Sequence, residues 1–317
     1  GKQEVSWSVE SYVLPRGGST VPDIDPLLEA ALGSAYGAAT SETYTLTDLN
    51  ALPTVHMART SNGVFREDLF GCYVDEMSIT ASAGDEPRIS FSGGAYNYAL
   101  TGTGTTHASS SVTSTSVPMS SGEGVSFMVG SVIDINGGST IVKAKSGDTL
   151  TVKSGTYTNG EAVTPETYSE STGGSPTTGI TGSLTLNSVT LPITSFDVTL
   201  TNGIKPLSDE AFEKGTSDFI AGYRSVSVRA RKDFIKSLAA RYVATSATAD
   251  PSFTAVPIQV NLGATAGKIV SVFVPTAELD FGAIDVPEAE EAILNIPFTG
   301  LGSSGGDEFK IAWNQGD

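Results

Sequence analysis

The chain has few cysteines, histidines and basic residues, and it lacks long apolar runs. Cys72 is the only cysteine among 317 residues, so an internal disulfide is excluded and assembly in a reducing cytoplasm is favoured. No apolar stretch approaches the roughly 20 residues of a membrane-spanning helix. The first residues show no basic-then-apolar leader pattern. We therefore expect no membrane partner.

Basic residues are outnumbered by acidic ones, with 18 Lys and Arg against 35 Asp and Glu, a formal net charge of -17. Such a surface repels phosphate, which disfavours tight binding to the outside of nucleic acid. The charge fits a protein that is kept soluble by its surface. It also fits a surface that faces DNA without binding it, and the charge alone does not choose between these two interpretations.

Motifs for cofactor or metal chemistry are weak. His56 and His107 are far apart and have no second ligand at metal spacing, so both are interpreted as ordinary loop residues. The segment 263–268, GATAGK, resembles a phosphate loop, but it is one residue short and Ile269 stands where Ser or Thr is needed. We interpret it as a hairpin turn, and we expect no metal site and no cofactor.

Two carboxylate pairs, Asp75 with Glu76 and Asp85 with Glu86, have residue types that could serve as the acid and base of sugar cleavage. Adjacent strand residues point to opposite faces, and carboxylates in turns are usually solvated. The sequence therefore predicts no catalytic residue, although a hydrolase with a carboxylate-lined cleft stays among the alternatives.

Residues 69–96, LFGCYVDEMSITASAGDEPRISFSGGAY, hold the clearest pattern in the chain. Apolar residues alternate with polar ones on both sides of a short turn at residues 83–86. The residues expected on the buried face are Met77, Ile79, Ala81, Ile89 and Phe91. Alternation with a period of two around a Gly turn predicts a half-buried β-hairpin.

Two short helices are predicted. In the first, residues 25–32, Asp25 is expected to cap the N-terminus, Pro26 to take the first helical position and Gly33 to end the helix. The second is expected at about residues 231–244, where Phe234, Leu238 and Tyr242 share one face.

Most of the remaining chain shows short alternating strands, so the predicted fold is mainly β with short helices, a β-sandwich or partial barrel. Residues 101–124 are dominated by Thr, Ser and Gly and are interpreted as a loop or linker, as are residues 169–179; residues 207–222 are interpreted as a loop with a helical turn. Two related domains are expected, 1–170 with the Ser/Thr-rich insert and 171–317, since each half offers antiparallel strands plus one helix.

Four segments together resemble the major tail tube proteins of long, non-contractile (siphophage-type) phage tails. They are SWSVESYVLPRGGSTVPDIDPLLEAALG (6–33), VDEMSITASAGDEPRISFSGGAY (74–96), LTLNSVTLPITSFDVTLTNGIKPL (184–207), and TAGKIVSVFVPTAELDF (265–281) followed by LNIPFTGLGSSGGDEFKIAW (294–313). The order and spacing of the segments carry the resemblance. The insert at 101–124 and the loop at 207–222 depart from the family pattern.

The resemblance implies a structural virion protein of the tail, assembled in the bacterial host cytoplasm and without enzymatic activity. Its copies would form rings around a continuous inner β-barrel, as trimers with pseudo-sixfold symmetry or as hexamers, and the rings would stack through loops and arms. Other tail proteins (tape measure, tail terminator and distal tail protein) are the implied partners. Double-stranded DNA would pass through without specific binding.

An acidic lumen fits such a conduit, because basic walls would bind the phosphates of DNA and slow its passage. Like-charged walls act over a Debye length of about 8 Å. The strand residues Asp75, Glu76 and Asp197 are the candidates for acidic groups that face the lumen.

Other functions remain open at this point. A capsid decoration protein or the tube of a contractile injection system would share the β-rich pattern. A secreted or surface β-sandwich adhesin or carbohydrate-binding module would share the acidity and the Ser/Thr richness.

Overall fold

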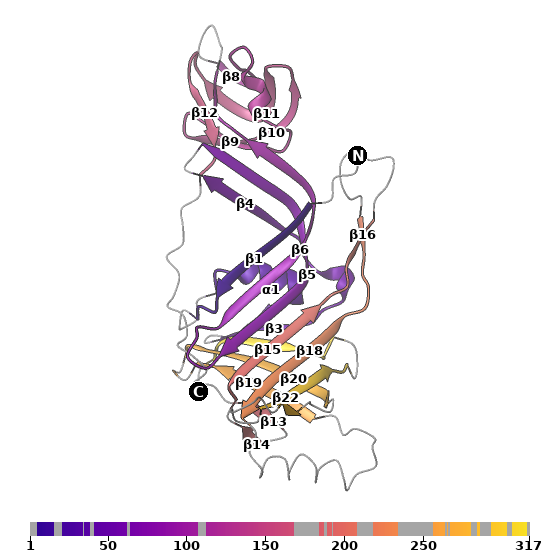
Figure 1. The fold of residues 1–317 in the computed structure, drawn as a ribbon. Coiled ribbons are helices and arrows are strands. Elements are labelled where there is room, and N and C mark those ends of the chain that lie inside the picture. Colours follow the sequence, from indigo (N-terminus) through magenta and orange to yellow (C-terminus); the bar gives the residue numbers. More distant parts are fainter. Residues whose placement is uncertain are drawn as a thin grey trace.

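The computed structural model describes most of the chain and confirms a mainly β protein. The described residues are 5–15, 21–33, 35–38, 41–61, 64–106, 112–167, 184–186, 189–191, 193–207, 218–233, 256–263, 265, 267–279, 284–285, 293–302 and 306–315. Figure 1 shows a large β body, a smaller sheet at the far end of a long strand extension, and a narrow β-ribbon beside it.

The body is built on a two-faced run of six antiparallel strands in the order β1-β6-β5-β15-β18-β22. Their bounds are β1 (Val5–Tyr12), β5 (Phe65–Ser82), β6 (Arg88–Thr101), β15 (Ser195–Thr201), β18 (Ser225–Asp233) and β22 (Ile293–Gly300). The predicted hairpin is confirmed as β5 and β6, where Met77 pairs with Phe91 and Ile79 with Ile89. All the residues expected on its buried face are buried.

The same sheet continues past β22 and folds over to form a partial barrel. The strands beyond β22 are β20 (Ile269–Leu279), β19 (Val256–Leu262), β13 (Leu184–Leu186), β14 (Val189–Leu191), β23 (Lys310–Gln315), β3 (Ser41–Thr45) and β2 (Ala35–Ala38). In addition, β21 (Ile284–Asp285) pairs with β22, and β4 (Val55–Ser61) pairs with β5. Residues 263–268 connect β19 to its antiparallel neighbour β20, which confirms the predicted hairpin turn. The core lies between the six-stranded run and the strands that fold over it.

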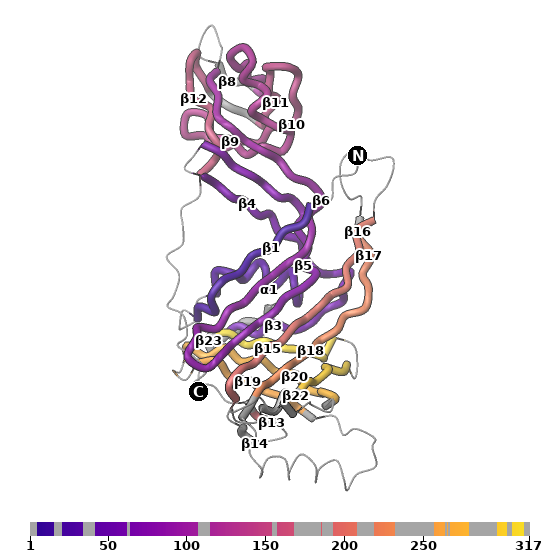
Figure 2. The backbone as a smooth tube through the Cα atoms, viewed as in Figure 1, coloured from indigo at the N-terminus to yellow at the C-terminus, as the bar shows by residue number. Residues whose placement is uncertain are grey.

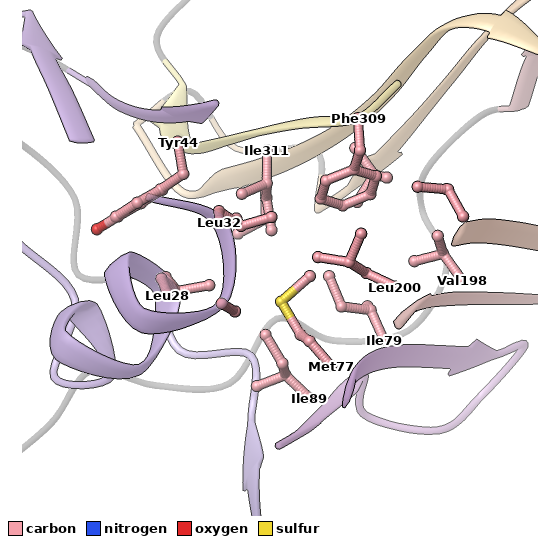
Figure 3. Packing of buried hydrophobic residues seen from close by; sticks show 14 of the residues in the cluster. Leu28, Leu32, Tyr44, Met77, Ile79, Ile89, Val198, Leu200, Phe309 and Ile311 are labelled. Carbon is pink, nitrogen blue, oxygen red and sulfur yellow. The ribbon is translucent and has the colours of Figure 1, made fainter. Parts of the chain in front are cut away.

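Helix α1 (Asp25–Leu32) is confirmed, and its buried side chains belong to the core of the body. Leu28 and Leu32 point toward Met77 and Ile89 of the β5–β6 hairpin (Figure 3). Each fully buried leucine contributes about 1.5–3 kcal/mol relative to an exposed one.

The predicted cap of this helix is wrong. Ile24 occupies the N-cap position without a side-chain bond, and Asp25 instead accepts a hydrogen bond of 2.6 Å from the Tyr44 hydroxyl. Burial and this carboxylate raise the pKa of Tyr44, so the phenol stays a donor. Asp25 therefore joins the helix to β3 rather than capping it.

A second, six-stranded sheet forms what we call the distal module, residues 104–165. Its strands are β7 (Gly104–Thr105), β8 (Val112–Pro118), β9 (Val132–Ile135), β10 (Gly138–Ser146), β11 (Thr149–Tyr157) and β12 (Ala162–Pro165), with a 3-10 turn at Glu123–Ser126. It has its own buried cluster, separate from that of the body. The loop predicted over 101–124 is wrong for Val112–Pro118, where Val117 is fully buried in a strand.

Strands of both predicted halves join in the single body sheet, so the division at residue 170 stays a prediction. Of the second predicted helix, Arg231–Asp233 belong to β18, and residues 234–244 lie outside the described residues. The linker predicted at 169–179 also lies outside them. The loop predicted at 207–222 is wrong for Asp218–Ile220, which forms strand β17.

Candidate functional surfaces

The outward face of the six-stranded run is polar, which we call the polar face. Its residues align in rows across the strands, because the antiparallel registers place them directly opposite one another. One row reads Glu10, Ser90, Ser78, Thr199, Ser227 and Thr299, and the next reads Ser8, Ser92, Glu76, Thr201 and Ser225. The hydroxyls of Ser78 and Ser90 lie 2.8 Å apart. A sheet with an apolar core face and a hydroxyl-rich outer face is suited to line water.

Charges of both signs lie on the polar face. Glu76 is exposed at the centre of β5, and Asp197 lies on the neighbouring β15, directly opposite Arg229 of β18. The structure therefore brings Glu76 and Asp197 onto one surface. Glu10 forms an ion pair with Arg88 at one side of it.

Asp75 has a different position from the other two predicted acidic residues. The β5–β6 register shifts between Val74 and Glu76, so Asp75 occupies a β-bulge. Its carboxylate Oδ1 accepts a hydrogen bond of 2.6 Å from the Ile204 amide, and its carbonyl accepts one from Asn202. Asp75 thus holds the segment that follows β15.

Arginines and hydroxyls of the polar face were missed by the sequence analysis. Arg88, Arg229 and Arg231 alternate with buried residues in their strands, as Glu76 and Asp197 do. The same period-two pattern could have found them, but the pairing that brings six strands together is not visible in the local sequence.

Strand β1 leaves a hydrogen-bonding edge available. In the part of the chain that the structure describes, β1 pairs only with β6, over all eight of its residues. An unpaired edge of this length is a template for another strand. The chain is therefore suited to extend its sheet with a strand from elsewhere.

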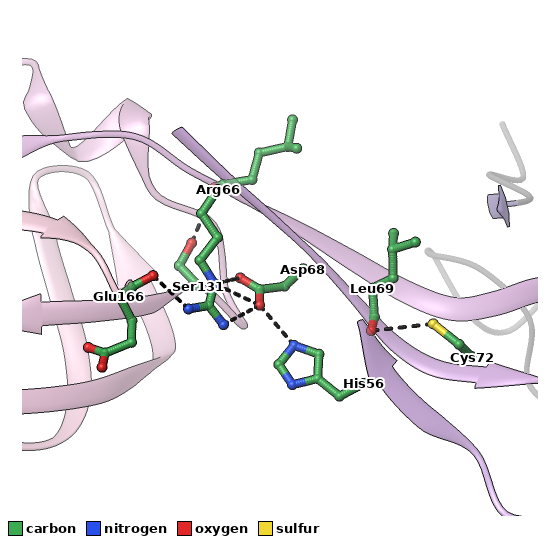
Figure 4. Close-up of polar contacts among 8 residues, drawn as sticks. His56, Arg66, Asp68, Leu69, Cys72, Ser131 and Glu166 are labelled. Carbon is green, nitrogen blue, oxygen red and sulfur yellow. Dashed lines mark hydrogen bonds and ion pairs between the residues drawn. The ribbon is translucent and has the colours of Figure 1, made fainter. Parts of the chain in front are cut away.

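A buried ion pair joins the distal module to the body (Figure 4). Arg66 and Asp68 of β5 are both fully buried, with Nη2 of Arg66 2.6 Å from Oδ1 of Asp68. Nη1 of Arg66 donates to the carbonyl of Glu166, where the chain leaves the module. His56 lies in β4, so its interpretation as a loop residue is wrong; its Nε2 is 2.8 Å from Asp68 Oδ1.

A two-stranded ribbon, which we call the arm, extends from the end of β15. It consists of β16 (Lys205–Leu207) and β17 (Asp218–Ile220), and it projects from the same end of the body as the distal module (Figure 2). Phe219 packs on Tyr73 and Tyr96, with ring centroids 5.5 Å apart in each case. Exposed apolar side chains remain on the arm and at its base, namely Leu207 at 42%, Ile220 at 54% and Tyr223 at 97% exposure.

The described ranges contain no group of three or more His, Cys, Asp or Glu side chains that could hold a metal ion. They likewise contain no helix that is both long enough and apolar enough to cross a membrane. His107 lies outside the described residues.

The comparisons with known proteins gave one finding. Residues 1–149 match the family model described as phage tail tube protein. No curated protein matches the chain. The match covers α1, the β5–β6 hairpin and much of the distal module, which includes three of the six strands behind the polar face.

Proposed function

We propose that the chain is a structural component of the phage tail, because residues 1–149 match the family model described as phage tail tube protein, and that its copies close into rings that stack as a DNA conduit. The polar face would line the bore, and the free edge of β1 would pair with a neighbouring copy. The chain would perform no covalent chemistry. The observation that carries this proposal is the two-faced six-stranded run with one edge open.

Closure across copies follows from the physics of sheet edges. An exposed edge strand risks aggregation, and only a closed barrel removes every edge. Wide barrels of roughly 16 strands or more enclose an aqueous channel. The first half of the chain contributes β1, β5 and β6 to the polar face, and the second half contributes β15, β18 and β22. Because each half contributes three strands, this division supports a trimer with pseudo-sixfold symmetry over a hexamer.

The wall of the bore would carry a small excess of carboxylates. Glu10, Glu76 and Asp197 are balanced by the three arginines of the face, and Glu278 adds a carboxylate opposite Thr299. Hydroxyls fill the positions between them. Such a wall offers DNA phosphates no continuous basic track, so DNA would slide through without specific binding.

The arm and the distal module would lie outside the bore and contact adjacent copies or rings. A two-stranded ribbon alone is marginally stable in water, and the exposed Leu207, Ile220 and Tyr223 would be covered by a second copy. Tape measure, terminator and distal tail proteins would meet the ends of the tube. Assembly would take place in the host cytoplasm.

Electron microscopy of the purified protein tests the proposal. Rings or tubes should form as the concentration is raised, with the polar face on the inner wall in a reconstruction. Monomers that persist at millimolar concentration and in the presence of tail-tip complexes would contradict it.

The charge of the bore can be changed by Glu76→Lys. Tubes of this variant should still form, because Glu76 is exposed, but they should bind short double-stranded DNA about tenfold more tightly at low salt. Co-sedimentation of labelled DNA measures this. The control is Thr115→Lys with Thr151→Lys, which changes the net charge equally on exposed positions of the distal module. Equal DNA binding by both variants would show that Glu76 does not face the bore.

The distal module should be dispensable for ring closure. Arg66 pairs with Thr101, where the chain enters the module, and binds Glu166, where it leaves. The ends of the module are therefore adjacent, and a short Gly/Ser linker can replace residues 102–165. We expect tubes with an unchanged inner wall and a thinner outer profile by electron microscopy. Loss of rings from a variant whose body is still folded would contradict this.

A further inference from the structure

The two ends of the arm meet in a buried polar cluster. Asn202, which enters the arm, is 1% exposed, and its Oδ1 accepts a hydrogen bond of 2.9 Å from Nε of Arg224, which leaves the arm. The backbone at this point is equally close-packed. A Cβ on Gly203, which has a φ of +66°, would lie 2.7 Å from the carbonyl oxygen of Tyr223. The two crossing segments therefore have little freedom to tilt.

The cluster ties the arm to three separate parts of the body. Nδ2 of Asn202 donates to the carbonyl of Ala31 in α1 at 2.9 Å and to that of Val74 in β5 at 3.0 Å. Nη1 of Arg224 donates to the carbonyl of Thr47, the residue whose own amide binds Leu32 at the end of α1. These hydrogen bonds to the helix and to the sheet together fix the direction of the arm.

This arrangement is energetically expensive. Burial lowers the pKa of Arg224, and nearby Glu308 acts against that shift. Nη2 of Arg224 and Oε2 of Glu308 are buried without a hydrogen-bond partner. Apolar residues of similar size often serve stability as well as a buried charge does, or better. A buried polar cluster of this kind fixes geometry, because hydrogen bonds have preferred directions and apolar contacts do not.

We propose that Asn202 and Arg224 are positioning residues that hold the arm at the angle required to meet a second copy of the chain. This inference rests on the proposed function, since it assigns a role to the arm in assembly. It explains why a costly charge lies at the base of the arm rather than an apolar residue. It also explains why Asp75, in the bulge, accepts two hydrogen bonds from the same segment.

The test compares Arg224→Met with Arg224→Lys. Methionine fills a similar volume but leaves Glu308 and the carbonyl of Thr47 without the guanidinium, so the melting temperature should fall, and assembly is measured well below the melting temperatures of all the variants. The critical concentration for tube formation should rise about tenfold, which corresponds to about 1.4 kcal/mol. Lysine can donate to Asn202 or Thr47 and should restore part of the loss. Lys268→Met, at an exposed turn remote from the arm, is the charge-matched control.

Hydrogen exchange separates this inference from the proposed function. Amides in Lys205–Leu207 and Asp218–Ile220 should exchange faster in Arg224→Met, even in the unassembled protein. Absence of tubes from the unchanged protein would defeat the proposed function, while the exchange rates would still decide the role of Arg224. Normal assembly with normal exchange in Arg224→Met would overturn the inference, as would a loss of assembly that only follows a loss of folding.

Discussion

Asp68→Ala is expected to lower the free energy of unfolding by about 3–5 kcal/mol, because it leaves the guanidinium of Arg66 buried without its counter-charge. Both side chains are fully buried, and three hydrogen bonds join the guanidinium to the carboxylate. His56 would lose its contact with the same carboxylate. Urea denaturation followed by far-UV circular dichroism measures the change.

The neighbouring residue Glu67 is the matched control. It also forms an ion pair, with Arg59 at 2.8 Å, but the side chain of Arg59 is 79% exposed. Glu67→Ala should therefore cost less than about 1 kcal/mol. The double variant Arg66→Met with Asp68→Leu should recover most of the stability, because it removes both charges. A loss for Asp68→Ala no larger than that for Glu67→Ala would contradict this explanation of the joint.

The parts of the fold that could be predicted are those with short-range patterns. The β5–β6 hairpin and α1 both follow from apolar periodicity over a few residues, and the side chains expected on the buried face of the hairpin are buried. The alternation of apolar and polar residues within a strand indicates which of its two sides is buried. Local patterns were sufficient here because the turns between these residues are short.

The predictions that proved wrong have physical causes of a different kind. Asp25 was expected to cap α1, but the hydroxyl of Tyr44, 19 residues away, binds it more favourably in a buried setting. Val112–Pro118 was interpreted as a loop from its composition, although Thr and Val favour strands. The segment pairs with β11, and its Val117 is buried in the core of the distal module.

The candidate site could be predicted only in part, because it depends on register. Glu76 and Asp197 were named from their strands, and the structure places both on the polar face. Asp75 was named with them, but the bulge redirects its carboxylate to Ile204. A bulge is invisible in a single strand because it is a property of two paired strands. The hydroxyl rows, the buried ion pair and the base of the arm depend on pairing in the same way.

Gly93→Ala tests the bulge on which the arm depends. A Cβ at Gly93 would lie 1.9 Å from the carbonyl oxygen of Tyr73 and 3.1 Å from the amide nitrogen of Asp75, both of which are backbone atoms that cannot rotate away. The strands must separate at this point, so we expect a loss of about 3 kcal/mol or more in the free energy of unfolding.

The same change should also raise the critical concentration for tube formation by more than the loss of stability explains. The displaced Asp75 would release its hydrogen bonds to Asn202 and Ile204, so the base of the arm would lose its support on β5. Gly138→Ala in β10 is the control, because its Cβ would meet only one carbonyl oxygen at 3.3 Å. Chemical denaturation and sedimentation of tubes measure the two effects. A variant Gly93→Ala that is as stable as Gly138→Ala would show that β5 can shift to accept a side chain, and the bulge would then not be the element that supports the arm.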